Sequence, residues 1–263
     1  MLPKKIHYCW FGGNKLPDLA IKCIESWKKY CPDYEIIEWN ETNFDLECCD
    51  FVKEAYKAKK WAFVSDYARL KVVYDNGGIY LDTDVELVKS LDILLQEKCY
   101  FGEETTGYVN TGLGFGAEKH SPIIDLLLKE YYNKHFINDD GSYNMDPCPK
   151  INTKPLLQFG YSFSGNKIWR CDDFTVYPPE YFCPLEYNTN KMNITPNTLS
   201  IHLFNASWLS TLDKLINRIE GSSKRGISLK IRRLVSFPFR VINKFKKNGF
   251  SNTIKQILNI IQR

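Results

Sequence analysis

The chain has 263 residues, of which 44% are hydrophobic and 25% charged, with a formal net charge of +4. This length and composition are typical of a soluble globular chain with one sizeable core. No run of about 18 apolar residues is present, and the N-terminus lacks an apolar leader, so we expect neither a membrane span nor a secretory signal. Nine cysteines lack any Cys-x-x-Cys spacing, which excludes a zinc ribbon and favours a reducing compartment.

Strand and helix signals alternate in the first half, as is typical of an α/β fold with a largely parallel sheet. The longest helix has a stripe of apolar residues with a period of 3.6, and Asn76-Gly77-Gly78 closes it. In chain order we expect a strand at 6–11, a helix at 17–31, a strand at 34–39, a helix at 61–75, a strand at 79–81, a helical turn at 91–96, strands at 99–103 and 112–117, and a helix at 122–136.

Residues 138–197 contain seven prolines, and we interpret them as a loop-rich excursion that lines a site. A final strand is expected at 200–204. Eleven of the 35 basic residues but none of the 31 acidic residues follow Glu220, so residues 1–220 carry a net charge of −7. The sequence therefore predicts a catalytic domain at 1–220 and a basic amphipathic tail at 221–263.

Two carboxylates, Asp82 and Asp84, directly follow the expected strand at 79–81. Residues two apart on a strand point to the same side, so both oxygens can face one cation. Carboxylates of this kind suit Mg²⁺ or Mn²⁺ that also binds phosphate. The alternative is a turn with two solvated aspartates.

Asp66 and Arg69 lie three positions apart on the expected helix and so share a face. We interpret them as an acid and a base that bond sugar hydroxyls beside the metal; the alternative is an ordinary surface ion pair. His202, taken alone, is more often a structural histidine than a ligand. His7 lies inside an expected strand and is interpreted as a core residue.

Three motifs together resemble glycosyltransferase family 32, whose members carry an Asp-x-Asp motif. They are Lys5–Gly13 (KIHYCWFGG), Trp61–Val85 (WAFVSDYARLKVVYDNGGIYLDTDV) and Ile201–Trp208 (IHLFNASW), in the family's order. The family includes bacterial capsule and polysaccharide enzymes and yeast mannosyltransferases, and the motifs are also similar to the catalytic domain of the large clostridial glucosylating toxins. The resemblance implies a GT-A fold, an α/β Rossmann-like mixed and mostly parallel sheet flanked by helices.

The resemblance also implies roles for individual residues. Trp10 would stack on the nucleotide base, and Asp66 and Arg69 would grip the donor sugar. Asp84 would bind the metal directly. The remaining positions implied are Tyr80 and Asp82 near the ribose and metal, His202 as a late metal ligand where the toxins have an acidic residue, Ser207 and Trp208 as donors to the diphosphate, and Asn110 in the sugar pocket.

The expected activity is metal-dependent transfer of a hexose, with retention of configuration, from a nucleotide diphosphate sugar to a glycan or lipid-linked glycan in cell-surface polysaccharide synthesis. A UDP-sugar is the favoured donor and GDP-mannose an alternative. Retention by front-face attack is favoured over a covalent intermediate, because no carboxylate is obviously placed as a nucleophile. Two other functional classes stay open: a different metal-dependent nucleotide enzyme, such as a nucleotidyltransferase or phosphohydrolase, and a non-catalytic membrane-bound glycan-binding protein.

The tail at 224–263 mixes cations with apolar residues and predicts two amphipathic helices, separated near Pro238 and Gly249. Such helices bind anionic membrane surfaces, and the alternative is a helix that is merely solvated or packed on itself. Nucleic acid is the other ligand of basic segments, but the acidic body and the absence of a nucleic-acid motif argue against it. We therefore expect a cytoplasmic protein that lies peripherally on the inner face of the membrane.

Overall fold

The computed structural model describes residues 1–163, 165, 167–186, 191–205, 212, 215, 216, 219, 235–240 and 242. The chain divides into two compact units, Met1–Glu186 with Met192–Phe204, and Tyr187–Lys191 with Asn205–Arg263. In the second unit residues 235–240, which include Pro238, are helical. Most of the predicted tail lies outside the described residues.

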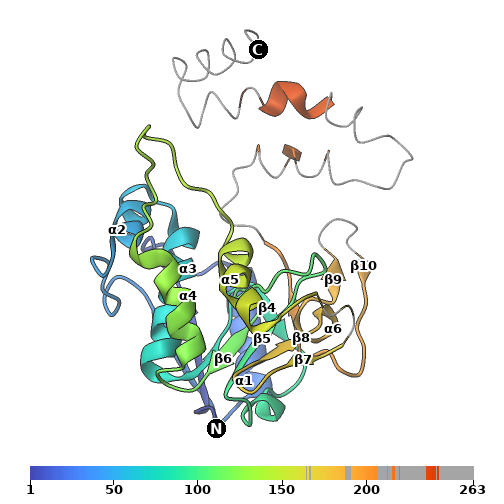
Figure 1. Ribbon diagram of the computed structural model, residues 1–263. Coiled ribbons are helices and arrows are strands. Elements are labelled where there is room, and N and C mark those ends of the chain that lie inside the picture. Colours follow the sequence, from blue (N-terminus) through green and yellow to red (C-terminus); the bar gives the residue numbers. More distant parts are fainter. Residues whose placement is uncertain are drawn as a thin grey trace. The chain divides into compact units, whose positions relative to one another are not determined.

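The first unit contains a seven-stranded sheet in the order β2-β1-β3-β6-β5-β8-β7 (Figure 1). The pairings make five strands run in one direction, with β6 and β7 opposed to them. Two two-stranded sheets accompany it, β9 with β10 and the antiparallel pair β4 with β11, and the latter contributes to the site. The strands are β1 Lys5–Cys9, β2 Glu35–Trp39, β3 Gly78–Tyr80, β4 Val85–Leu87, β5 Cys99–Gly102, β6 Phe115–Ala117, β7 Trp169–Arg170, β8 Thr175–Tyr177, β9 Leu185–Glu186, β10 Lys191–Met192 and β11 Ser200–His202.

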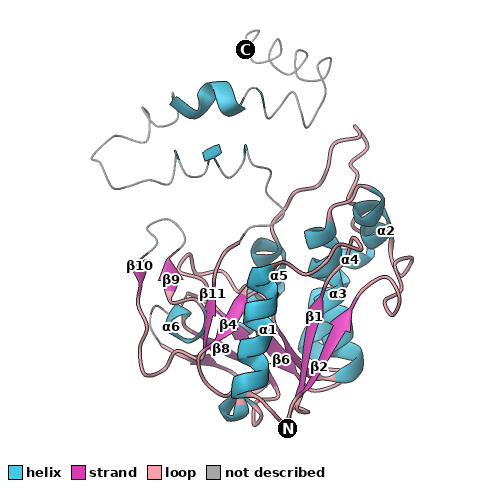
Figure 2. Cartoon of the chain, turned by 180° about the vertical axis from the view of Figure 1, so that it is seen from behind, coloured by secondary structure: helices cyan, strands magenta, loops and turns pink. Residues whose placement is uncertain are grey.

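Helices cover both faces of the sheet, and Figure 2 shows the side on which α1 lies. Alternate strand residues point to opposite faces, so Tyr80 and Phe101 join one apolar cluster while Ile79 and Tyr100 join the other. The first cluster includes residues of α2 to α5, and the second includes residues of α1 and α6. The helices are α1 Asp18–Tyr30, α2 Asp50–Lys57, α3 Trp61–Asn76, α4 Pro122–Tyr132, α5 Cys148–Leu156 and α6 Pro179–Phe182, with 3₁₀ turns at Asp92–Leu94 and Leu157–Phe159.

Helix α3 is buried on most of its circumference, because it packs against α2, α4 and β1. It ends at Gly77 (φ 67°), and Gly78 (φ 107°) also has a positive φ. A Cβ atom on Gly78 would lie 2.9 Å from the Lys5 carbonyl oxygen. Two consecutive glycines therefore allow a sharp reversal that sends the chain from α3 directly into the central strand β3.

The expected α/β architecture, a mixed and mostly parallel sheet flanked by helices, is confirmed, with five of the seven strands of the central sheet running in one direction. The expected loop at 138–197 is wrong in part, because it contains α5, α6 and four short strands. Pro149 and Pro179 lie in the first turns of these helices, where the missing N–H is not needed, although Pro155 lies inside α5. Helix α2 was not expected at all. Within the described part of the chain, no helix has the length and apolarity needed to cross a membrane.

Candidate active site

Asp82, Thr83 and Asp84 occupy the turn between β3 and β4, and the Val85 N–H closes this turn on the Asp82 carbonyl oxygen at 3.0 Å. The expectation that the two aspartates lie on one strand is therefore wrong. The strand must stop because β3 belongs to the seven-stranded sheet, whereas β4 pairs with β11. The turn still brings both carboxylates to the same side.

His202 joins these carboxylates from the last strand of the first unit. The β4–β11 register places it opposite Val85, and the Leu203 N–H donates to the Asp84 carbonyl oxygen at 2.9 Å. One ligand atom from each of Asp82, Asp84 and His202 lies within 4.8 Å of the others. The structure thus assembles the three predicted metal-binding side chains in one place.

The chemistry of this cluster fits a divalent cation. Two carboxylates and an imidazole are ligands that Mn²⁺ and Mg²⁺ enzymes use, and His202 Nε2 lies only 3.2 Å from Asp84 Oδ1. Burial lowers the pKa of His202, but the Asp84 carboxylate outweighs this effect and the pKa is raised. The other ring nitrogen, Nδ1, is buried and has no hydrogen-bond partner among the described residues. The three side chains present mainly electron-pair donors to their shared centre, so a bound cation would give these atoms a partner.

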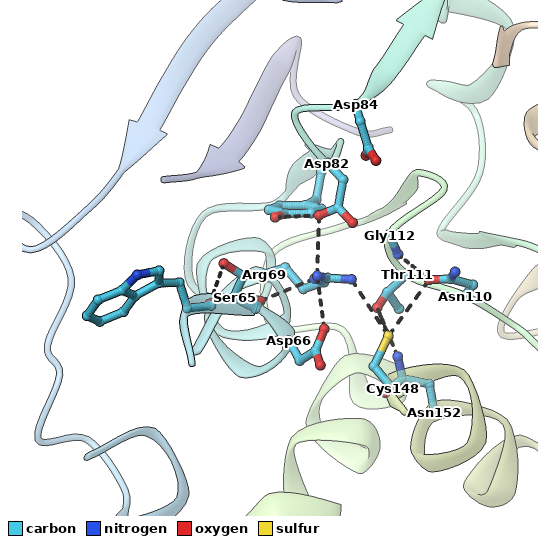
Figure 3. Close-up of polar contacts among 12 residues, drawn as sticks. Ser65, Asp66, Arg69, Asp82, Asp84, Asn110, Thr111, Gly112, Cys148 and Asn152 are labelled. Atoms are coloured by element: carbon cyan, nitrogen blue, oxygen red, sulfur yellow. Dashed lines mark hydrogen bonds and ion pairs between the residues drawn. The ribbon is translucent and has the colours of Figure 1, made fainter. Parts of the chain in front are cut away.

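The Arg69 guanidinium lies at the centre of the site (Figure 3). Its side chain is only 5% exposed, and Nη2 lies 2.9 Å from Asp66 Oδ1 and 3.3 Å from Asp82 Oδ1. Nε donates to the Ser65 carbonyl oxygen at 3.2 Å, and the guanidinium also lies 5.2 Å from the centroid of the Tyr80 ring. The predicted pairing of Asp66 with Arg69 is confirmed. It is a buried ion pair, not a surface one, and Arg69 connects it to Asp82 of the Asp82–Asp84–His202 cluster.

Burial raises the pKa of Asp66 to about 6, although the Arg69 guanidinium acts in the opposite direction. Burial also raises the pKa of Asp82, where Arg69 lowers it and Asp84 raises it. Two carboxylates therefore share a single guanidinium, and Asp84 adds a third negative charge beside Asp82. This excess of negative charge is a second reason to expect a cation here.

Polar residues from two other segments, α5 and the loop before β6, form a hydrogen-bonded group next to Arg69. The Cys148 thiol, at the start of α5, lies 3.7 Å from Arg69 Nη1 and 3.7 Å from Asn110 Oδ1. Asn152 Nδ2, one turn further along α5, donates to Thr111 Oγ1 at 2.9 Å. Asn110, which was predicted for the sugar pocket, belongs to this group. Cys148, Thr111 and Asn152 were not predicted as site residues, although Cys148 and Asn152 fall in the segment that the sequence expected to line a site.

Gly112 lies against the carboxylate of Asp82, and its N–H donates to Asn110 Oδ1 at 2.7 Å. A Cβ atom at this position would lie 2.4 Å from Asp82 Oδ2 and 3.0 Å from Asn110 Oδ1. The side chains of Asp82 and Asn110 therefore already occupy the space that a methyl group at position 112 would need.

We expect Gly112→Ala to displace Asp82 and lower turnover by about a hundredfold, while the free energy of unfolding falls by no more than about 1–3 kcal/mol. Nucleotide-sugar hydrolysis and urea titration measure the two effects. Gly160→Ala is the control, since φ is +77° there but nothing lies within 4 Å of the added methyl group. Equal losses of activity in the two variants would show that crowding at Asp82 is unimportant.

Trp10 directly follows β1 and is only partly buried, and its indole Nε1–H donates to the Asn14 carbonyl oxygen at 2.7 Å. Tyr80 is fully buried, and its hydroxyl donates to Asp82 Oδ1 at 2.9 Å. Ser207 and Trp208 lie outside the described residues. His7 is structural as expected, because Nε2 lies 2.9 Å from the Gly77 carbonyl oxygen and Nδ1 accepts from Trp39.

Residues 17–101 match a protein-family model described as the glycosyltransferase sugar-binding region containing the DXD motif. This part of the chain is therefore similar to the DXD-containing sugar-binding region of glycosyltransferases. This region includes Asp66, Arg69, Asp82 and Asp84, and it ends before Asn110 and His202. The predicted resemblance is thereby confirmed.

Three characterised relatives are also glycosyltransferases by name. The chain is 27% identical over 147 residues to inositol phosphoceramide mannosyltransferase 3 of Schizosaccharomyces pombe, with 51% of this chain and 40% of the relative covered. It is 24% identical to inositol phosphoceramide mannosyltransferase 1 of the same yeast (85% and 67% covered), and 24% identical to human alpha-1,4-N-acetylglucosaminyltransferase (61% and 42% covered). The chain thus spans less than half the length of two of these relatives. Among solved structures, the PaToxG glycosyltransferase is 19% identical, with a TM-score of 0.43 over 60% of this chain and 70% of that chain.

Proposed function

We propose that the chain is a metal-dependent hexosyltransferase that uses a nucleotide diphosphate sugar, with a UDP-sugar favoured and GDP-mannose as the alternative. One observation carries this proposal: Arg69 connects the sugar-facing acid Asp66 to the Asp82–Asp84–His202 cluster within a single buried network. A nucleotide sugar needs both parts of this network. Its sugar hydroxyls need hydrogen-bond partners such as Asp66 and Arg69, and its diphosphate needs the positive charge of a cation at the cluster.

In this reaction each side chain has a separate task. Mn²⁺ or Mg²⁺ held by Asp82, Asp84 and His202 would stabilise the negative charge that develops on the diphosphate leaving group. Arg69 is held on one side by Asp66 and on the other by Asp82, so it would donate to a donor-sugar oxygen without reorganising. Asp66 would accept a bond from a donor-sugar hydroxyl. Trp10, at the end of β1, would stack on the base, a contact worth about 1–3 kcal/mol.

We also propose that the anomeric configuration is retained. The name of the human relative specifies an α linkage, and nucleotide hexoses such as UDP-glucose are themselves α-linked at the anomeric carbon. Asp66, the carboxylate nearest the proposed sugar position, is already engaged by Arg69. This favours front-face attack, in which the departing phosphate oxygen takes the proton of the acceptor hydroxyl.

A donor screen tests the proposal directly. The full chain is incubated with UDP-glucose, UDP-galactose, UDP-N-acetylglucosamine and GDP-mannose, with Mn²⁺, and release of the nucleoside diphosphate and free sugar is followed. We expect hydrolysis of at least one donor, and its loss with excess EDTA. Release of sugar phosphate and nucleoside monophosphate would instead indicate a phosphohydrolase, and tight donor binding without turnover would indicate a glycan-binding protein.

The acceptor is proposed to be a glycan or glycolipid. Two of the relatives are named for transfer to inositol phosphoceramide, which is a lipid. A role in cell-surface polysaccharide synthesis, on the cytoplasmic face of the membrane, remains part of the proposal. The eleven cations after Glu220 support it, because clustered Lys and Arg attract anionic lipids.

We expect removal of residues 224–263 to abolish binding to vesicles containing phosphatidylserine and leave donor hydrolysis near the level of the full chain. Each Lys or Arg near an anionic surface contributes about 1 kcal/mol. Sedimentation with phosphatidylserine and with neutral vesicles measures the binding. Undiminished sedimentation of the truncated chain would exclude an anchoring role, and loss of folded protein would place the tail in the core.

A further inference from the structure

Two aromatic side chains are exposed next to the candidate site. Tyr108 is 46% exposed and Phe163 is 58% exposed. Tyr108 follows Gly107 in the loop after β5, and the Phe163 ring packs against Gly107 from the segment before β7. A Cβ atom on Gly107, whose φ is +85°, would lie 2.9 Å from Phe163 Cδ2. Position 107 therefore requires glycine for two reasons, the positive φ of the turn and the close packing of the Phe163 ring.

This loop is held in place from beneath. The Tyr161 side chain is buried, and its hydroxyl lies 2.7 Å from Glu103 Oε2 and 3.1 Å from the Gly107 carbonyl oxygen. The turn itself is closed by the Glu104 N–H, which donates to the Tyr108 carbonyl oxygen at 2.8 Å. Both rings thus extend from a supported backbone, and large exposed apolar groups on such a support commonly mark a binding surface.

Two hydrogen bonds and one close contact connect this loop to the Asp82–Asp84–His202 cluster. Glu104 Oε1 accepts from Asn110 Nδ2 at 2.6 Å, and Asn110 Oδ1 accepts from the Gly112 N–H at 2.7 Å. Gly112 in turn lies against Asp82, as described above. The loop that carries Tyr108 is therefore bonded to the site residues Asn110 and Gly112, whereas the proposed donor-sugar partners Asp66 and Arg69 are buried.

We propose that Tyr108 and Phe163 form an acceptor subsite that stacks a pyranose ring of the glycan that receives the hexose. This inference rests on the proposed function and names the part of the same site that selects the acceptor. Pyranoses have an apolar face of C–H bonds and a rim of hydroxyls, so aromatic side chains beside a polar group recognise them. Glu104 is such a group. The Glu104 carboxylate, which is only partly buried, also argues against an anionic membrane as the occupant.

Saturation-transfer NMR on the full chain tests the subsite with three probes, methyl β-lactoside, methyl β-glucoside and methyl α-mannoside. We expect transfer to the C–H protons of at least one probe. Tyr108→Ala and Phe163→Ala should each raise the dissociation constant of that probe by about five- to tenfold. Tyr132→Ala removes a ring that is also 53% exposed, at the end of α4, and should change nothing.

Three outcomes would overturn the proposal: no saturation of any probe by the wild type, unchanged affinity in both ring variants, or an equal loss in Tyr132→Ala. Nucleotide binding is measured on the same samples, and an equal loss of nucleotide affinity would assign the rings to the donor site or the fold instead. Gly107→Ala displaces the Phe163 ring without removing it. Weaker probe binding in this variant would show that the position of the ring matters, and not only its presence. Probe binding through the rings without nucleotide-sugar hydrolysis would preserve the subsite and remove the transferase proposal.

Discussion

Asp84→Asn is expected to lower nucleotide-sugar hydrolysis by about a thousandfold or more and to leave the chain folded. The substitution removes one negative charge from the ligand set, and with it the charge that holds a divalent cation. The unfolding temperature without metal should change little, because Asp82 loses a like-charged neighbour while His202 loses its carboxylate partner. Addition of Mn²⁺ should raise the unfolding temperature of the wild type but not that of the variant.

Glu86→Gln is the matched control for this prediction. Glu86 lies two residues further on, in β4, and its carboxylate pairs with Lys22 at 3.0 Å. Its neutralisation should change neither hydrolysis nor the effect of Mn²⁺. Wild-type turnover by Asp84→Asn at saturating Mn²⁺ would contradict the assignment of Asp84 as a ligand, and a loss in both variants would indicate a general effect of surface charge.

The second large effect is expected at Arg69. Arg69→Met leaves Asp66 and Asp82 without their shared guanidinium, in a site where both are largely shielded from water. Removing one partner of a buried ion pair costs about 3–5 kcal/mol of stability, because the remaining charge is uncompensated. The free energy of unfolding should fall by that amount, and hydrolysis should be lost at any temperature at which the chain stays folded.

Lys71→Met on the same helix provides the comparison. Lys71 pairs with Asp75 at 2.6 Å, but both side chains are more than one-third exposed. A pair of this kind on a helix surface contributes about 0.3–0.5 kcal/mol. In denaturation with guanidinium chloride, the loss of unfolding free energy should therefore be about ten times larger in Arg69→Met than in Lys71→Met. Similar losses would show that the Arg69 network is no more important for stability than a surface pair.

The half of the site that comes from one stretch of sequence could be predicted from local rules. Asp66 and Arg69 are three residues apart on one helix, and the two aspartates of the turn are two apart, so spacing alone brings each pair together. The apolar period also located α3, and the glycines located its end. In each case the interacting residues are close in sequence.

The other half depends on tertiary contacts that no local pattern contains. Helix α5 was hidden by its prolines, and with it Cys148 and Asn152, which reach the site only because α5 packs on α4. Gly112 was read as part of a strand, yet its role depends on an atom of Asp82. The position of His202 was implied by resemblance, and its contact with Asp84 follows from the β4–β11 register.

The glycine reversal after α3 has a consequence for the order in which the site can form during folding. Because Gly77 and Gly78 let β3 return directly from α3, the contacts among Asp66, Arg69 and Asp82 close a loop of fewer than about twenty residues, and short loops close with little loss of chain entropy. His202 is separated from Asp84 by most of the domain, so its contact requires a much longer closure. The Asp66–Arg69–Asp82 network should thus be able to form as soon as α3 and β3 pack together, whereas the His202 imidazole reaches it only when β11 has paired with β4. Contact order therefore makes the metal cluster the last part of the site to assemble.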